Sequence, residues 1–180
     1  MHILFISRAF DGCEHLILFM MTLSQDDNSC GLCAMQVGDK IQNLVEKLRQ
    51  TSLNQSQMNA VISIISAVHC KHSNLVKLIW GPPGTGKTKT VSTTLWAFKS
   101  LKCRILMCSP TNISVIGVCH RFLQALKHFS RQADTDGLPC SLGDIVLFGN
   151  KYKMDITEEI QVVLLDYRVD ELFKCFSPSS

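Results

Sequence analysis

Hydrophobic positions along the chain follow two spacings, which predict helices and strands in different places. Apolar residues recur every three or four positions where a helix buries one face, and they form short runs where a strand is buried on both faces. The helical spacing, together with flanking polar residues, predicts helices over residues 41–48, 54–69, 87–100, 113–129 and 156–173. The short runs "LVKLIW", "RILMCS" and "DIVLFG" predict strands over residues 75–80, 104–109 and 144–149.

The order of these elements predicts an α/β fold. A strand at 75–80, a helix at 87–100 and a strand at 104–109 form a βαβ unit, which implies a parallel sheet with flanking helices and a right-handed crossover. Residues 1–36 show no clean period, and residues 1–40 are interpreted as an N-terminal appendage. Residues 41–150 would then carry the sheet, and residues 151–180 a helical segment after it.

Length and composition are those of a globular chain. Its 180 residues fit one domain, and 46% of them are hydrophobic while 18% are charged. The best apolar run, from Leu16 to Leu23, has eight residues, whereas a bilayer span needs roughly 20. Asp11 and Glu14 precede that run, where a signal peptide would carry basic residues. We therefore expect no membrane partner.

The nine cysteines are an odd number without a secretory signal, which favours reduced thiols and a nuclear or cytoplasmic location. Cys30 and Cys33 have the spacing of a zinc-ligand pair, and His69, Cys70 and His72 could complete a site. A structural zinc site usually has a second close pair at a familiar spacing, and that pair is missing here. Free thiols are therefore the simpler interpretation.

Charge is distributed unevenly along the chain. The net charge is +3, yet residues 47–133 contain twelve Lys and Arg and no Asp or Glu. The segments on either side carry six acidic residues against two basic ones, and nine against four. A solvated basic face is one explanation, and a surface that binds a polyanion is the other.

The chemistry begins at "GPPGTGKT", residues 81–88, which matches the phosphate-binding P-loop pattern. Glycines allow several backbone N–H groups to turn toward one phosphate, and the helix that follows adds the positive end of its dipole. In this pattern the lysine reaches the β/γ-phosphates and the Thr hydroxyl ligates Mg²⁺. The predicted ATP-binding residues are Gly81, Pro82, Pro83, Gly84, Thr85, Gly86, Lys87 and Thr88, with Lys87 and Thr88 as the catalytic candidates and Thr88 as the Mg²⁺ ligand.

A glutamine near the start of the predicted helix 54–69 is a second candidate. Gln57 lies 24 residues before Gly81, and a Gln side chain can both donate to and accept from the adenine N6 and N7 positions. The alternative is a capping box, in which Asn54 is the N-cap residue and Gln57, at position N3, bonds back to the Asn54 backbone N–H. Spacing alone does not decide between the adenine contact and the capping box.

"CSPTNISV", residues 108–115, is the third motif. It lies where a parallel strand ends and a helix begins, at the sheet edge where such folds bind ligands. Thr111 and Asn112, with the helix N–H groups, could hold a nucleic-acid phosphate. Plain capping of the helix by Thr or Asn is the alternative.

Together, "LNQSQ", "GPPGTGKTKT" and "SPTN" resemble superfamily 1 helicases of the senataxin and nonsense-mediated-decay type, and "LGDIVLFGNKYKM" resembles a plant subgroup of them. The resemblance covers about residues 52–176 and implies part of a RecA-like domain that binds ATP and Mg²⁺ and contacts single-stranded RNA or DNA as a monomer. It implies that Gln57 contacts adenine and that Pro110, Thr111 and Asn112 contact the backbone of the strand. Ser109 stands where many relatives have Ala.

The acidic motif that such helicases use to hold Mg²⁺ and activate water has no convincing match. "VVLLD" ends at Asp166, but Tyr167 follows it and the run lies within the helical spacing of 156–173. We therefore expect an incomplete helicase core. The alternatives are a protein-remodelling ATPase of the AAA type, which "GPPGTGKT" also fits, and a non-catalytic fragment that binds nucleotide or a partner.

Overall fold

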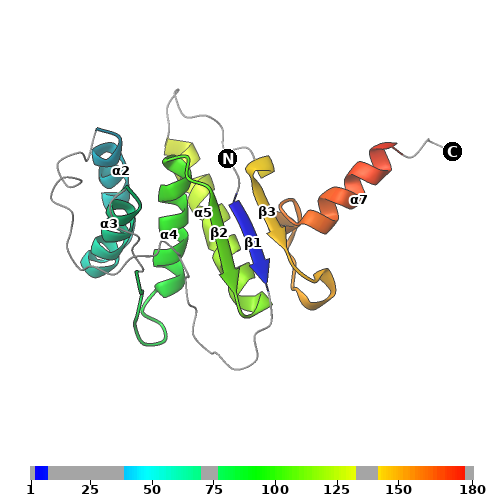
Figure 1. Ribbon diagram of the computed structural model, residues 1–180, viewed down its shortest axis with the longest axis horizontal. Coiled ribbons are helices and arrows are strands. Elements are labelled where there is room, and N and C mark those ends of the chain that lie inside the picture. The colour runs from blue at the N-terminus through cyan, green and yellow to red at the C-terminus, as the bar shows by residue number, and fades with distance from the viewer. Residues whose placement is uncertain (1–2, 8–38, 70–76, 133–141, 177–180) are drawn as a thin grey trace. The chain divides into compact units, whose positions relative to one another are not determined.

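The computed structural model of the chain describes residues 3–7, 39–69, 77–132 and 142–176 (Figure 1). The chain divides into two compact units. The first, which we call the sheet unit, consists of residues 1–16 and 104–180. The second, the P-loop unit, consists of residues 17–103. No helix among the described residues is both long and apolar enough to cross a membrane.

The regular elements in the described part of the P-loop unit are helices. It contains α2 (Asp39–Arg49), α3 (Gln55–His69) and α4 (Lys87–Ser100), which confirms the three helices predicted there. Its core is formed by apolar side chains one helical turn apart, among them Leu44 and Leu48 of α2 and Val61 and Ile65 of α3. The helix α3 packs against both α2 and α4.

α4 is buried around its whole circumference from Thr90 to Phe98, although four of these nine residues are Ser or Thr. Their hydroxyls donate to backbone carbonyls four residues earlier: Thr94 to Thr90 at 2.9 Å, and Ser92 to Thr88 at 2.8 Å. A buried hydroxyl costs little when it is bonded in this way. The polar sequence of α4 is therefore compatible with an interior position.

The sheet unit contains a three-stranded parallel sheet in the order β2-β1-β3. Its strands are β1 (Ile3–Ser7), β2 (Ile105–Ser109) and β3 (Ile145–Phe148). The registers place Leu4 opposite Leu106 on one side and opposite Val146 on the other. The long helix α5 (Asn112–Gln132) packs against β1 and β2, with Val115, Val118 and Phe122 fully buried (Figure 1).

The central strand was not predicted, and the strand predicted over residues 75–80 is wrong in its described part. Residues 77–80 form neither helix nor strand, and the side chains of Leu78 and Trp80 are 75% and 86% exposed; residues 75 and 76 lie outside the described ranges. β2 and β3 instead pair with β1, which lies between them and forms backbone hydrogen bonds with both strands. The predicted βαβ unit is therefore replaced by a parallel sheet that includes residues 3–7.

The predicted helix over residues 156–173 is broken into α6 (Glu158–Gln161) and α7 (Leu165–Phe176). The break occurs where Val163 and Leu164 are buried beside β3: the Leu147 N–H donates to the Val163 carbonyl at 2.7 Å, and Leu147 forms a parallel bridge with Leu164. Backbone pairing with the strand at this point replaces the helical bonds. Short 3-10 turns, η1 (Leu142–Asp144) and η2 (Lys151–Lys153), flank β3.

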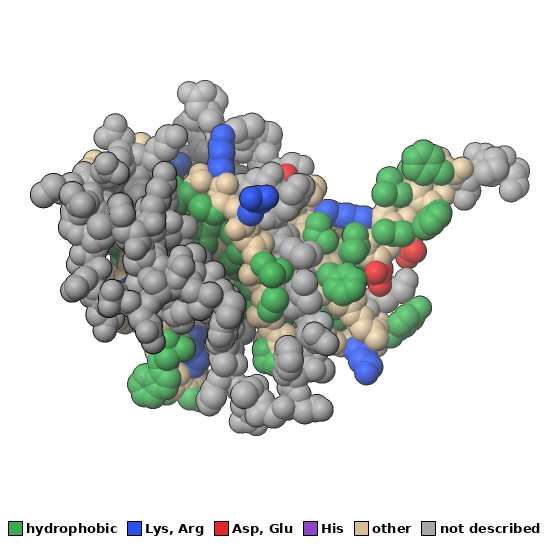
Figure 2. All heavy atoms as spheres, viewed as in Figure 1, with side chains coloured by type: hydrophobic (Ala, Val, Ile, Leu, Met, Phe, Trp, Pro, Cys, Tyr) green, Lys and Arg blue, Asp and Glu red, His purple; other side chains and the backbone are tan. Residues whose placement is uncertain are grey.

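Apolar side chains also gather on α7 (Figure 2). They recur at helical spacing and include Val169, Leu172, Phe173 and Phe176, which are 39%, 57%, 69% and 81% exposed. The base of this helix is anchored by Arg168, whose guanidinium donates to the carbonyls of Val162, Gly143 and Leu142.

Candidate functional site

The candidate nucleotide site is the loop of residues 81–86 and the first turn of α4. Gly84 and Gly86 have φ values of +80° and +84°, a region that side chains with a Cβ rarely adopt. Gly86 is the N-cap residue of α4 and supplies no side-chain cap, so the helix begins without one. The helix also has no acidic residue in its first turn. These features leave the positive end of α4 suited to an anion.

Lys87 lies across this loop. Its ammonium group donates to the carbonyls of Gly81 at 2.5 Å and Pro82 at 2.9 Å. The Thr85 hydroxyl also donates to the Pro82 carbonyl, at 2.8 Å, which tightens the turn through Pro83. The lysine charge, the two glycines and the helix start are thus brought together within eight residues.

Gly81 and Gly86 are also needed for the space they leave. A Cβ on Gly81 would come within 2.8 Å of the Thr85 hydroxyl oxygen. A Cβ on Gly86 would come within 2.5 Å of the Gln57 side-chain nitrogen. A larger residue at either position would therefore have to displace the side chain of Thr85 or Gln57.

Gln57 makes the capping box and a contact with the P-loop at once. Its N–H donates to the Asn54 side-chain oxygen at 2.9 Å, and its own Oε1 accepts from the Asn54 N–H at 3.0 Å. Its Nε2 donates to the Thr85 carbonyl at 2.9 Å. The capping interpretation of the sequence is thus observed, and the same side chain lies beside Gly86.

The residues present fit a nucleoside triphosphate better than they fit a metal ion alone. Loop glycines at positive φ, a helix N-terminus and Lys87 together match a phosphate chain. Thr88, the second residue of α4, is half-buried and carries the hydroxyl suited to Mg²⁺. No group of three or more metal-ligating side chains occurs among the described residues. A bound Mg²⁺ would therefore depend on Thr88 and the nucleotide's own oxygens.

Pro110, Thr111 and Asn112 lie in the sheet unit, at the carboxyl end of β2. The Thr111 hydroxyl accepts from the Ser114 N–H at 3.2 Å and donates to the Ser114 hydroxyl at 2.7 Å, which confirms that Thr111 caps α5. Asn112 instead reaches out of the helix, where its amide nitrogen donates to the Lys153 carbonyl at 3.0 Å. α5 has no acidic residue in its first turn.

The loop after β3, residues 149–153, was missed as part of this site. β2 and β3 are parallel, so the segments that follow them emerge at the same edge of the sheet, and the bond between Asn112 and Lys153 joins them. We call Ser109 to Asn112 and Asn150 to Lys153 together the sheet-edge site. A signal was present in the sequence: "GNKYK" places an aromatic residue between two lysines directly after a predicted strand.

Asp166 lies in the first turn of α7 and is not the end of a strand. The sequence interpretation of this residue as helical is therefore confirmed. The possible zinc ligands Cys30, Cys33, Cys70 and His72 lie outside the described residues, as does the side chain of His69.

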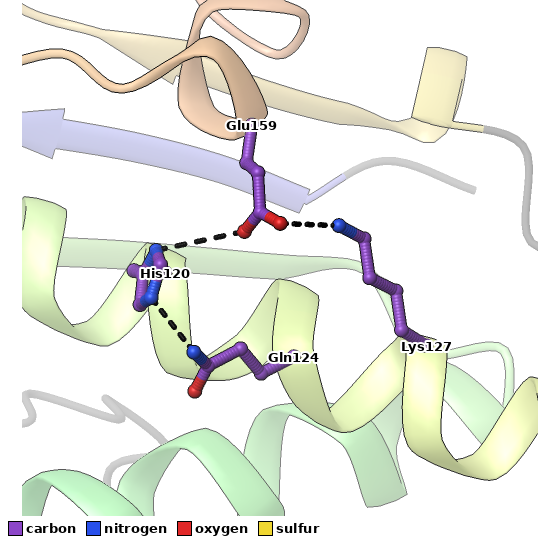
Figure 3. Close-up of polar contacts among 4 residues, drawn as sticks. All are labelled: His120, Gln124, Lys127 and Glu159. Carbon is purple, nitrogen blue, oxygen red and sulfur yellow. Dashed lines mark hydrogen bonds and ion pairs between the residues drawn. The ribbon is translucent and has the colours of Figure 1, made fainter.

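α5 and α6 are joined by a polar cluster on their exposed sides (Figure 3). Glu159 accepts from the Lys127 ammonium at 2.6 Å and lies 3.8 Å from Nδ1 of His120, whose Nε2 is 2.8 Å from the Gln124 amide nitrogen. The hydrogen bond and the charge of Lys127 hold the pKa of Glu159 below its usual value. The cluster fixes α6 against α5.

The family model described as "AAA domain" matches residues 52–177. A "Regulator of nonsense transcripts 1 homolog" of Neurospora crassa is 39% identical over 70 residues, which cover 38% of this chain and 6% of that protein.

Two further relatives are similar over shorter stretches. The "ATP-dependent helicase NAM7" of Saccharomyces cerevisiae is 42% identical over 64 residues, which are 35% of this chain and 6% of that protein. A "Regulator of nonsense transcripts 1 homolog" of Arabidopsis thaliana is 39% identical over 64 residues, 35% of this chain and 4% of the relative. The chain thus matches only a small part of each. No solved structure matches it.

Proposed function

Because the chain belongs to the AAA domain family, we propose that it is the ATP-binding portion of an ATP-dependent RNA or DNA helicase. It would form part of a RecA-like domain of the senataxin-like or nonsense-mediated-decay helicase group, as a plant-type member and a fragment of the whole enzyme. The full enzyme would couple ATP hydrolysis to movement along a single strand. The relatives named as a nonsense-transcript regulator and an ATP-dependent helicase support this choice.

One observation carries the proposal. Gly84 and Gly86 adopt left-handed conformations directly before a helix that begins with Lys87, and the lysine ammonium lies over the same loop. This arrangement suits the β/γ-phosphates of ATP at the backbone N–H groups, with Lys87 neutralising them and Thr88 contacting Mg²⁺. Bound Mg²⁺ would supply Lewis-acid stabilisation of the phosphoryl oxygens.

In this proposal Gly81 through Gly86 contact the phosphates, and Gln57 contacts adenine. The Gln57 side chain lies beside Gly86, close to the loop, but is engaged with Asn54 and Thr85. It would have to exchange these bonds for bonds to the base. Selection of adenine therefore competes with the capping of α3.

The sheet-edge site would contact the single strand through Pro110, Thr111 and Asn112. The N-terminal turn of α5 has no acidic residue, and phosphate oxygens are the groups that a helix N-terminus binds. Such contacts fix the strand's position and carry little information about its sugar. The proposed ligand is therefore single-stranded RNA or DNA, without a preference assigned.

The proposal is tested by binding, turnover and sizing of the whole chain. We expect a monomer that binds Mg-ATP and a fluorescent single-stranded oligonucleotide, with little ATP turnover because no acidic motif accompanies the P-loop. Asn112→Ala should weaken binding of the strand, while Asn59→Ala, which removes an exposed Asn from α3, should not.

Other results would contradict parts of this account. A hexamer without any response to oligonucleotide would favour a protein-remodelling ATPase of the AAA type. A folded monomer that binds neither ligand would favour a non-catalytic interaction fragment. Rapid ATP turnover that is lost in Asp166→Asn would show that the acidic motif had been misassigned.

A further inference from the structure

The loop of residues 150–153 is held in a defined shape beside the start of α5. The Asn150 side-chain oxygen accepts from the Tyr152 N–H at 3.0 Å, and its carbonyl accepts from the Lys153 N–H at 3.0 Å. Asn112 holds the Lys153 carbonyl from the side of α5. Met154, which follows, is only 8% exposed and anchors the end of the loop.

This loop presents an aromatic ring to solvent. Tyr152 is 88% exposed, although the turn that carries it is hydrogen-bonded on both sides. Ile113, the residue after Asn112, is 84% exposed. Apolar surface is thus displayed by the two segments that the bond between Asn112 and Lys153 brings together.

The charges and polar groups around the ring suit an anionic partner. Lys153 is adjacent to Tyr152 and exposed, and α5 begins without an acidic residue in its first turn. Ser109, at the carboxyl end of β2, is 4% exposed, and its hydroxyl has no hydrogen-bond partner among the described residues. Buried polar groups in proteins are nearly always bonded, so an unpaired one at a sheet edge points to a ligand or an ordered water.

A single-stranded nucleic acid combines the two chemistries that this surface offers. Each nucleotide has a phosphate, which binds a helix N-terminus or lysine, and a base whose flat face stacks on an aromatic ring. A duplex hides those faces, and an acidic peptide does not repeat this pairing of ring and phosphate. The match is therefore to an unpaired strand.

We propose that Tyr152 is a stacking platform for a base of the single strand whose phosphate is held by the N-terminal turn of α5 and Lys153. This inference rests on the proposed function, since it extends the same strand-binding site. It assigns the loop after β3 a part in binding, and it adds to the strand contact of Asn112 a second role, which is to position this loop through the Lys153 carbonyl.

The experiment compares Tyr152→Ala and Tyr152→Phe in the whole chain, with Phe176→Ala as the control. Phe176 is an aromatic residue of similar exposure, 81%, on α7 of the same unit. The probes are a fluorescent single strand and an abasic sugar-phosphate strand of the same length. Tyr152→Ala should bind the base-bearing strand roughly 5- to 100-fold more weakly and leave the abasic strand unchanged. Tyr152→Phe and Phe176→Ala should bind like the wild type.

The possible failures are distinguishable. Wild-type affinity in Tyr152→Ala would overturn the stacking role and leave the proposed function intact. Equal losses for both strands would also overturn it, because the ring would then act through the shape of the loop. If the wild-type chain binds neither strand, both the stacking role and the strand-binding part of the proposed function are wrong.

Discussion

The P-loop site and the sheet-edge site both suit phosphate, but they are assembled over very different distances along the chain. In the P-loop, the lysine and the carbonyls it contacts are five and six residues apart. In the sheet-edge site, the bond between Asn112 and Lys153 spans 41 residues and depends on two strands being parallel. A short motif can specify the first site by itself, whereas the second exists only when the sheet forms.

The two sites also differ in the internal hydrogen bonds that a ligand would have to replace. Lys87 and Gln57 are already bonded to the P-loop backbone, so a nucleotide must compete with these internal bonds. At the sheet edge, Tyr152 and Ile113 are more than four-fifths exposed. We therefore expect nucleotide binding to rearrange side chains and strand binding to use a surface that is already formed.

The largest effect is expected from disrupting the packing of α5, because the start of this helix forms part of the sheet-edge site. Phe122 of α5 is fully buried, and Phe122→Ala should reduce the free energy of unfolding by about 3–5 kcal/mol. Denaturant unfolding measures the loss, and oligonucleotide titration should show weakened strand binding. His128→Ala removes an exposed ring from the same helix as a control. A much smaller loss in Phe122→Ala would contradict the assigned packing of α5.

A smaller effect, with opposite signs in the two regions, is expected from glycine substitutions. Gly86→Ala places a Cβ at positive φ and close to Gln57, so it should destabilise the chain by about 1–2 kcal/mol and reduce ATP affinity. Gly117→Ala lies within α5, where a Cβ meets nothing within 4 Å, and should stabilise the chain by about 0.5–1 kcal/mol. Thermal and denaturant unfolding measure both, and equal effects would contradict the strained geometry of the P-loop.

Gln57→Glu separates the two roles of this side chain. A carboxylate can still accept from the Asn54 N–H, so the capping of α3 should persist, but it cannot donate to the Thr85 carbonyl or to adenine. Loss of one such hydrogen bond should lower ATP affinity by about 0.5–1.5 kcal/mol. The helix content measured by circular dichroism should be unchanged. An unaltered preference for ATP over GTP in this variant would show that Gln57 does not contact adenine.

The smallest effect concerns pH and the cluster that joins α5 and α6. Lys127 lowers the pKa of Glu159 in the folded chain, so the ionised carboxylate stabilises the fold. This stabilisation is complete above the pKa of Glu159 in the unfolded chain, near 4.5, and it is lost as the pH falls through the lower pKa of the folded chain. The urea midpoints of wild type and Glu159→Gln should therefore differ at pH 7 and converge below pH 4.5. Glu158→Gln is the matched control. A difference that grows on acidification would have the wrong sign.

Much of the local structure could be predicted from the sequence, because its signals are local. Helical periodicity located α2, α3, α4 and α5, and the runs "RILMCS" and "DIVLFG" located β2 and β3. The P-loop geometry follows from glycines at fixed positions. These features depend on residues within a few turns of one another.

What could not be predicted depends on competition between distant segments. "ILFIS" at 3–7 and "LVKLIW" at 75–80 are both apolar runs suited to a strand, and the pattern does not say which of them pairs with β2. The break between α6 and α7 likewise arises from pairing of Val163 with β3. The contact of Asn112 with Lys153 could not be predicted for the same reason, because it follows only once the order of the strands in the sheet is known.

The loop of residues 81–88 is proposed to bind the phosphates of ATP. The most direct test is calorimetric titration of Mg-ATP and Mg-GTP into the whole chain, its Lys87→Ala variant and a Lys89→Ala control, in which the lost ammonium contacts Ser52 rather than the loop. Our prediction is that ATP binds more tightly than GTP, that Lys87→Ala loses this affinity, and that Lys89→Ala retains it. A folded wild-type chain that binds no ATP, or equal affinity in Lys87→Ala, would contradict it.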